Sequence, residues 1–124
     1  MPDNSQTLHE DVATLGPEVI DRHRAVASIM EELEAADWYD QRVAATNDGG
    51  LAEVLAHSRD EEKEHMAMTL EWLRRHDPQL DAALRTYLFT EGSIVAVEHA
   101  EQQIDAASPG VLSIGALRER KELI

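Results

Sequence analysis

Apolar residues recur at helical spacing along two long stretches of the chain. The first stretch runs from the start signal Gly16-Pro17-Glu18 to about Ala45, and the second from about Leu51 to His76. Proline in the first helical position, followed by an acid, is typical of a helix N-terminus. The pattern therefore predicts two helices. Their inward faces comprise Val19, Val26, Ile29, Leu33, Ala36 and Val43 in the first stretch, and Leu51, Leu55, Met66, Thr69 and Leu73 in the second.

Breaker residues separate these stretches and limit a third one. The segment 46–50, Thr-Asn-Asp-Gly-Gly, is a short connection, and short loops join antiparallel helices. Asp77-Pro78 ends the second helix and can open a third, which we expect at residues 79–90 with Gly92 as its stop. Residues 16–92 are therefore expected to form a helical hairpin and a short third helix.

The two ends of the chain carry weaker patterns. Residues 1–15 are polar and aperiodic, so we expect a flexible N-terminal segment. Residues 93–110 fit either a linker or a weak helix, and Ser108-Pro109-Gly110 closes them. Residues 111–124 form a separate tail.

Composition limits the size of the core and the kind of environment. With 124 residues, of which 4% are aromatic, a single chain has few large side chains to bury, so self-association is expected. The absence of cysteine excludes disulfides and thiolate metal sites and fits a reducing compartment. We see no apolar run long enough for a membrane span and no signal-peptide pattern, so we expect a cytoplasmic protein, or one enclosed by something cytoplasmic.

The charge is strongly negative, at -14, from 25 acidic and 11 basic residues. Such a surface repels phosphate backbones, which argues against nucleic-acid binding, and it attracts cations. Ordinary solubility is the alternative explanation for the charge. Six histidines favour the cation explanation, because imidazole and carboxylate together suit iron, manganese or zinc.

The most informative short motif is Glu62-Lys63-Glu64-His65. Glu62 interrupts the apolar face of the second helix, and His65, three residues later, lies at the edge of that face. An ionised carboxylate buried without a partner is costly, so a metal ion or a buried arginine must compensate it. The nearby bases Arg59 and Lys63 lie on other faces, which favours a metal.

Glu32 supplies a matching carboxylate on the first helix, at a similar distance from the hairpin turn. A di-iron site in a four-helix bundle takes one Glu from each of two helices and a Glu-x-x-His from each of the other two. This chain has half of that set, and two copies related by a two-fold axis would supply the whole of it. Their four carboxylates would balance two ferrous ions. The predicted fold is therefore all-α: an antiparallel two-helix hairpin, half of a ferritin-like four-helix bundle, plus a short third helix, with the bundle completed by dimerisation.

Taken singly, these residues have ordinary interpretations, as a solvated glutamate and a packed histidine. Glu31, Glu34 and Trp38 share the opposite face of the first helix and form either an acidic path for cations or a plain solvated face. Tyr39 is either a hydrogen-bonding neighbour of a metal ligand or a packing residue.

A second acidic group lies on the outer face of the second helix. It consists of His57, Glu61 and Glu64. These side chains can hold a loosely bound surface metal, although simple solvent exposure is the favoured explanation.

Several segments together resemble the encapsulated ferritins, over roughly residues 18–95. The matching segments are His23-Arg24-Ala25, Met30-Glu31-Glu32-Leu33-Glu34-Ala35, Asp37-Trp38-Tyr39-Asp40-Gln41-Arg42, Arg59-Asp60-Glu61-Glu62-Lys63-Glu64-His65, Met68-Thr69-Leu70-Glu71-Trp72-Leu73-Arg74-Arg75 and Leu84-Arg85-Thr86-Tyr87-Leu88-Phe89.

The resemblance implies a two-helix ferroxidase that forms a ring of five dimers, a decamer, with di-iron centres at a subunit interface. It implies that Glu32, Glu62 and His65 from two chains bind the iron. It also implies a metal-uptake region at Glu31, Glu34 and Trp38, and a peripheral metal site at His57, Glu61 and Glu64. Such proteins oxidise ferrous iron inside an encapsulin nanocompartment, where the mineral accumulates.

The tail is similar to the peptide that docks cargo on the inner wall of an encapsulin shell. Leu112, Ile114 and Leu117 offer three aliphatic side chains for shallow pockets, and Gly115 lies between them. On pattern alone the tail would be a frayed helix. The extension 119–124 is a departure from the docking motif.

Two alternatives remain open at this point. The chain can be a non-enzymatic helical cargo or scaffold protein whose acids are merely solvated. The same ligands can also hold manganese or zinc in place of iron.

Overall fold

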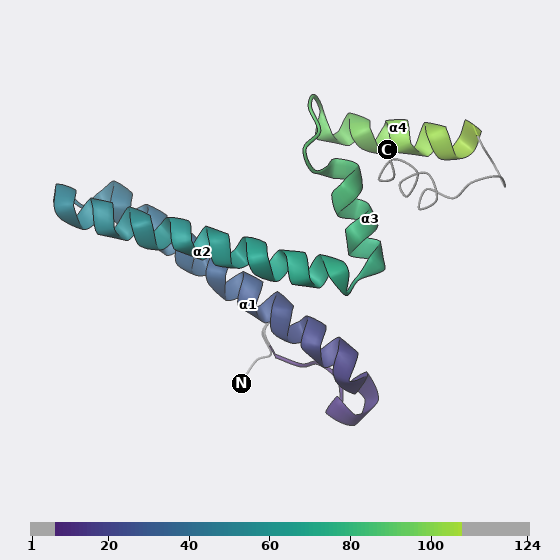
Figure 1. Ribbon diagram of the computed structural model, residues 1–124, viewed down its shortest axis with the longest axis horizontal. Helices are drawn as coiled ribbons and strands as arrows, with labels where there is room; N and C mark the ends of the chain where they lie inside the picture. The colour runs from purple at the N-terminus through teal and green to yellow at the C-terminus, as the bar shows by residue number, and fades with distance from the viewer. Residues whose placement is uncertain (1–6, 108–124) are drawn as a thin grey trace. The chain divides into compact units, whose positions relative to one another are not determined.

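The computed structural model of the protein describes residues 7–107, which form four α-helices and no β-strand. The first two, α1 (Val12–Ala45) and α2 (Gly49–Arg75), lie side by side as an antiparallel hairpin (Figure 1). The others, α3 (Pro78–Tyr87) and α4 (Ile94–Ala107), belong to a second unit that begins at Asp77. The predicted all-α class and helical hairpin are confirmed. Between residues 7 and 107, no helix combines the length and apolarity that a membrane span needs.

Aspartates begin the first three helices, for a local reason. An aspartate carboxylate in this position accepts a backbone N–H that has no carbonyl partner within its own helix. The pairs are Asp11 Oδ1 with the N–H of Ala13 at 3.1 Å, Asp48 Oδ1 with that of Leu51 at 2.8 Å, and Asp77 Oδ1 with that of Leu80 at 3.0 Å. Pro78 occupies the start of α3, as the sequence predicts.

The start of α1 differs from the prediction. Residues 12–15, expected to be part of a flexible segment, form a helical turn capped by Asp11. Gly16 then has φ 79° and ψ 163°, a conformation that only glycine adopts without strain. Pro17 restarts the helix and has no N–H to leave unsatisfied at the kink. Gly16 therefore joins a preceding turn to the long helix instead of opening it.

The third helix is shorter than predicted. It ends at Tyr87, because Leu88 is extended (φ -71°, ψ 144°) and Phe89 adopts a left-handed φ of 61°. Gly92, expected to stop the helix, lies beyond its end in a turn with φ 78°.

Within the segment 93–110, residues 94–107 form a helix. Ser93 precedes α4, and its Oγ accepts the backbone N–H of Ala96 at 3.3 Å. A serine before the first turn is a favourable helix cap.

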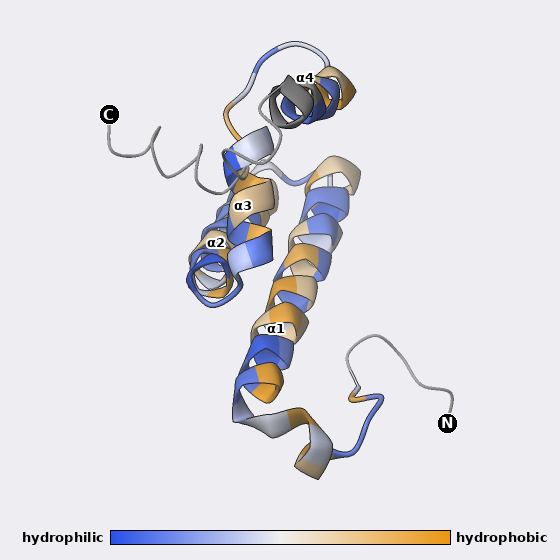
Figure 2. Cartoon of the chain, turned by 90° about the vertical axis from the view of Figure 1, so that its right-hand side faces the viewer, coloured by the Kyte–Doolittle hydropathy of each residue, from blue (hydrophilic) through white to orange (hydrophobic). Residues whose placement is uncertain are grey.

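The hairpin buries few apolar side chains by itself. Val19, Val26 and Leu33, spaced seven residues apart on α1, are 37%, 39% and 47% exposed. Figure 2 shows apolar positions recurring along the visible side of α1. An apolar stripe of this kind normally faces a partner element. Among the described residues, the buried hydrophobic side chains are Ala25, Ala36 and Leu73.

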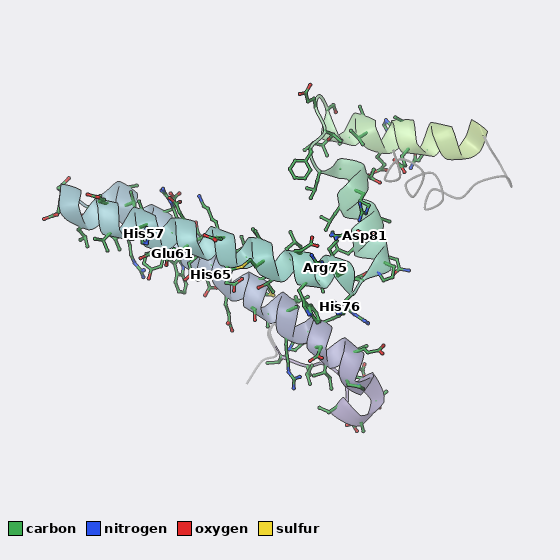
Figure 3. The ribbon with its side chains drawn as sticks, viewed as in Figure 1. His57, Glu61, His65, Arg75, His76 and Asp81 are labelled. Carbon is green, nitrogen blue, oxygen red and sulfur yellow. The ribbon has the colours of Figure 1, made fainter. Side chains whose placement is uncertain are left out.

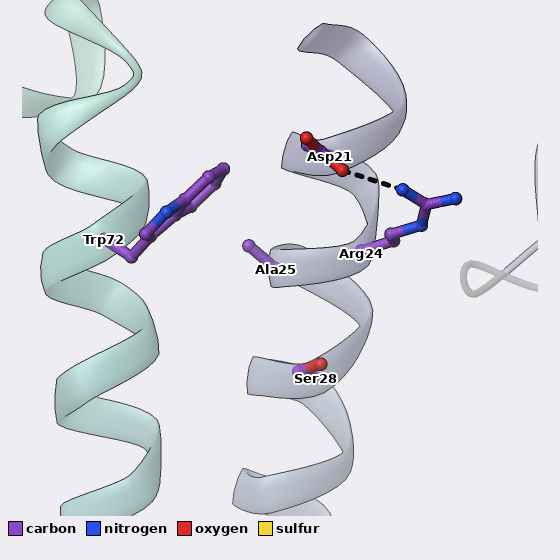
Figure 4. A pocket seen from close by; sticks show the side chains of 5 residues that line it. All are labelled: Asp21, Arg24, Ala25, Ser28 and Trp72. Carbon is purple, nitrogen blue, oxygen red and sulfur yellow. Dashed lines mark hydrogen bonds and ion pairs between the residues drawn. The ribbon is translucent and has the colours of Figure 1, made fainter. Parts of the chain in front are cut away.

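Trp72 is the largest side chain where the two helices meet near the open end of the hairpin. Its indole and Ala25 line one hollow of about 310 Å³ between α1 and α2 (Figure 4). The imidazole of His76 stacks on Trp72 with ring centroids 3.9 Å apart, and Nδ1 of His76 lies 2.7 Å from the Trp72 carbonyl oxygen. This stack closes the last turn of α2. The remaining side chains around the hollow are Asp21, Arg24 and Ser28.

Candidate metal centre

Glu62 and His65 lie one turn apart on α2, as their spacing predicts. Nδ1 of His65 is 4.0 Å from Oε2 of Glu62, which is too long for a hydrogen bond. Imidazole and carboxylate ligands bind metals such as zinc at about 2.0–2.2 Å, so both atoms can reach one cation. In the single chain the Glu62 side chain is 27% exposed and that of His65 is 49% exposed. Glu62 is therefore half-buried, whereas His65 faces outward.

Glu32 on α1 carries an unsatisfied buried atom. Its Oε2 is buried and has no hydrogen-bond partner. Buried carboxylate oxygens are costly unless a donor or a cation compensates them, so each exception calls for a physical reason. A bound cation is such a reason, and it fits the donor set, because carboxylate and imidazole together suit iron, manganese or zinc.

Glu32 and Glu62 stand at the same height on the hairpin. Glu32 lies 13 residues before Ala45, the last residue of α1 (45 - 32), and Glu62 lies 13 residues after Gly49, the first residue of α2 (62 - 49). At about 1.5 Å of rise per residue, both are therefore about 20 Å from the turn. The similar distance of Glu32 and Glu62 from the turn thus follows from where the two helices end and begin.

One chain brings only part of the predicted ligand set together. Among residues 7–107, no group of three acids or histidines is close enough to hold a metal ion. Glu62 and His65 approach each other, and Glu32 does not complete a three-ligand group with them. Within residues 7–107 of one chain, Glu32, Glu62 and His65 therefore do not form a three-ligand metal site.

The predicted cation path on α1 is exposed. Glu31 and Glu34 are both exposed, and Trp38 is 49% exposed. Tyr39 is half-buried, and the Arg42 guanidinium carbon lies 5.4 Å from the centre of its ring. The described contact of Tyr39 is therefore a cation–π interaction within α1.

On α2, the structure joins two of the three residues predicted as a surface cluster. Nε2 of His57 lies 2.8 Å from Oε1 of Glu61, and both side chains are exposed, at 74% and 54%. His57, Glu61 and His65 follow one another along α2 (Figure 3). Glu64 lines a shallow groove of about 470 Å³ further along the helix. Of the three residues that the sequence groups together, His57 and Glu61 therefore form a pair, and Glu64 lies apart from them.

Sequence reasoning missed an ion pair that links the two helices beside this site. Nη1 of Arg59 on α2 donates to Oδ1 of Asp40 on α1 at 2.9 Å, and its Nε donates to Oδ1 of Asp60 at 3.0 Å. The Arg59 side chain is 23% exposed. Its hydrogen bond holds the pKa of Asp60 below the ordinary value, and the hydrogen bonds to Asp60 and Asp40 raise the pKa of Arg59. The signal in the sequence is weak, because Asp40 and Arg59 lie at different distances from the turn and only the long arginine side chain spans the difference.

A second arginine cluster lies at the far end of α2. Arg74 donates to both carboxylate oxygens of Glu71 at 2.7 Å, and Nε of Arg75 donates to Oε2 at 2.6 Å. These hydrogen bonds, that from Arg74 first, lower the pKa of Glu71 to about 2. The cluster lies within one helix and outside the predicted site. The predicted docking residues Leu112, Ile114 and Leu117 lie outside the residues that the structure describes.

Comparison with known proteins gives consistent matches. The model of the EncFtn-like family matches residues 7–91. The "Encapsulated ferritin-like protein" of Rhodospirillum rubrum is 51% identical, over 95% of this chain and 92% of that protein. The "Encapsulin nanocompartment cargo protein EncC" of Myxococcus xanthus is 35% identical, over 73% of this chain and 79% of that protein. Among solved structures, protein ne0167 from Nitrosomonas europaea is similar with a TM-score of 0.68 and 54% identity, over 70% of this chain and 96% of that one.

Proposed function

This chain belongs to the EncFtn-like family, and on that premise we propose that it is a ferroxidase, oxidising Fe(II) to Fe(III) at a centre shared by two copies of the chain. Glu32, Glu62 and His65 of each copy are the proposed ligands of the substrate iron. The observation that carries the proposal is the buried and unpartnered Oε2 of Glu32, level on the hairpin with Glu62.

Two features of the fold support the proposal of a second copy. A single hairpin provides two of the four helices of a ferritin-like bundle and leaves an apolar stripe of α1 exposed. A two-fold axis brings the same patch of each copy together, which buries the stripe and doubles each ligand. Further association of such dimers into a ring of five is the proposed assembly.

The chemistry asked of these residues is modest. Two ferrous ions give up one electron each; with two protons, these reduce dioxygen to hydrogen peroxide or peroxide to two waters. The chain's own contribution is to hold the carboxylates and imidazole in place and to balance the positive charge away from water. Glu31 and Glu34, exposed beside Trp38, attract the incoming ions as part of a chain of charge -14.

The proposed cellular setting is the interior of an encapsulin nanocompartment in the cytoplasm. Relatives of this chain carry names that describe encapsulated or encapsulin cargo proteins. The proposed docking element is the tail that contains Leu112, Ile114 and Leu117. No storage cavity is needed in the chain itself if the shell collects the ferric product.

Anaerobic titration with Fe(II), followed by native mass measurement and then exposure to oxygen, tests the proposal. We expect one iron per chain, bound only to assemblies of even chain number, and rapid formation of ferric absorbance. Glu32→Ala should remove both, whereas Glu53→Ala, which removes an exposed acid of α2, should remove neither. Full iron binding by monomers would overturn the shared centre, and binding without oxidation would favour a cargo or scaffold protein. The same titration with Mn(II) and Zn(II) measures the metal preference.

A further inference from the structure

Arg59 forms a link between the helices that carry the proposed ligands. Its guanidinium is shared between Asp40 of α1 and its own neighbour Asp60, at 2.9 and 3.0 Å. Both aspartates are mostly exposed, at 65% and 62%, whereas the arginine side chain is 23% exposed. The guanidinium therefore lies against the hairpin and is held from two directions.

The location of this link relates it to the ligands. Arg59 precedes Glu62 by three residues, which is about 4.5 Å along α2. Asp40 follows Glu32 by eight residues, which is about 12 Å along α1 towards the turn. The Arg59 side chain thus starts closer to the turn than Glu62 and extends further towards the turn, to Asp40, which lies well past Glu32 in the same direction.

We propose that Arg59 is a positioning residue, whose ion pair with Asp40 holds α2 against α1 in the axial register that the short connection 46–48 sets. This inference rests on the proposed function, because the register matters only if Glu32 and Glu62 serve one centre. A slip of one helical turn, about 5.4 Å, would separate the paired atoms and put the two carboxylates at different heights. Of the apolar side chains buried among the described residues, Ala25 and Ala36 are small and interlock less than Leu73 does.

The expected effect falls on metal binding more than on stability. Ion pairs near the surface contribute little to folding, since solvent screens them. Residues that orient metal ligands, by contrast, change metal affinity by about 10- to 100-fold when they are replaced. A positioning role therefore predicts a large change in metal affinity and a small change in folding stability when Arg59 is replaced.

The test is an anaerobic Co(II) titration of the full chain, followed by its visible spectrum, since band intensity reports coordination geometry. We expect Arg59→Gln to weaken Co(II) binding about tenfold and to alter the bands, with the oligomeric state and thermal midpoint nearly unchanged. Asp40→Asn removes the same link from α1 and should act alike, which keeps the test valid if one variant folds poorly. The exchanged pair Asp40→Arg with Arg59→Asp should restore part of the affinity.

Arg24→Gln is the matched control. Nη1 of Arg24 also donates to an aspartate, Oδ1 of Asp21 at 2.8 Å, but both residues belong to α1. Its loss should leave the Co(II) titration as in the natural chain. Unchanged binding in both Arg59→Gln and Asp40→Asn would overturn the positioning role while the shared centre stands. Loss of assembly in step with loss of binding would also overturn it, and failure of the natural chain to bind Co(II) would remove the proposed function itself.

Discussion

Nδ1 of His65 lies 4.0 Å from Oε2 of Glu62, so the two side chains neighbour each other without a hydrogen bond. Neither group has to break a bond with the other to accept a cation. His65→Ala should therefore remove one ligand per chain and lower the rate of Fe(II) oxidation at least about tenfold, measured as ferric absorbance after mixing with oxygen. His99→Ala, at an exposed position of α4, should leave the rate as it is. Equal rates for the two variants would take His65 out of the centre.

The exposed stripe on α1 predicts the interface between copies. Leu33→Asp replaces an apolar side chain, which is 47% exposed in one chain, by a charged one. We expect dimers and larger rings to dissociate, while the helical circular dichroism at high protein concentration persists. Native mass spectrometry measures the shift. Ala44→Asp adds the same charge at another exposed position of α1 and should leave assembly intact; dissociation by both variants would point to general charge repulsion.

The Glu71 cluster predicts a pH dependence of stability. Hydrogen bonds from Arg74 and Arg75 lower the pKa of Glu71 from 4.5 to about 2. A depressed pKa contributes stability above the unfolded value, and that contribution declines as pH falls from 4.5 towards 2. Glu71→Gln should therefore lower the thermal midpoint slightly at neutral pH. The difference from the natural chain should vanish as the pH approaches about 2.

Thermal melts by circular dichroism across this range measure the difference. The effect is small because the Glu71 side chain is 42% exposed and solvent screens the ion pairs. In an Arg74→Gln, Arg75→Gln background, Glu71→Gln should have no such pH-dependent effect. A difference that grows as the pH falls would contradict the assigned cause.

Gly16 predicts a local and not a global weakness. An added Cβ would meet nothing within 4 Å, so the cost of Gly16→Ala comes from its φ of 79° alone, about 1–3 kcal/mol. We expect faster amide exchange in residues 12–15 and little change in α2. Gly50→Ala, in the first turn of α2, should be neutral or stabilising, since an added Cβ would lie in ordinary contact, 3.4 Å from Oδ1 of Asp48. Hydrogen exchange followed by mass spectrometry distinguishes the two, and protection of residues 12–15 in Gly16→Ala would show that the kink is dispensable.

The tail predicts a separation of docking from chemistry. Deleting residues 111–124 should abolish co-purification with an encapsulin shell and leave Fe(II) oxidation by the free protein unchanged. Replacement of Leu112, Ile114 and Leu117 by serine should have the same effect. Deletion of residues 119–124 alone measures the influence of the extension, and retention of the shell by the long deletion would place docking elsewhere in the chain.

Features set by neighbours in the sequence were predictable. The start of α3 at Pro78 and the adjacency of Glu62 and His65 depend on one turn of helix, so the pattern of residues contains them. The equal heights of Glu32 and Glu62 needed only the position of a short turn.

Other features depend on geometry that spacing does not express. The Arg59–Asp40 pair depends on how far a long side chain reaches between helices. The kink at Gly16 depends on one backbone angle, since the same Gly-Pro pair also opens helices. The early end of α3 follows from the left-handed backbone of Phe89, an unusual conformation for an aromatic residue. The proposed centre extends beyond one chain, so the sequence indicates its ligands but not their joint geometry.

In the proposed assembly, the small side chains buried in the hairpin make the stability of the chain depend on its own concentration. Ala25 and Ala36 allow the helices to lie close together but remove little apolar surface from water. In the proposed assembly, most of that burial occurs between copies, so stability rises with subunit concentration. Scarce, newly made chains would then be both easily degraded and unable to oxidise iron, and this chemistry would begin only where the subunits have accumulated.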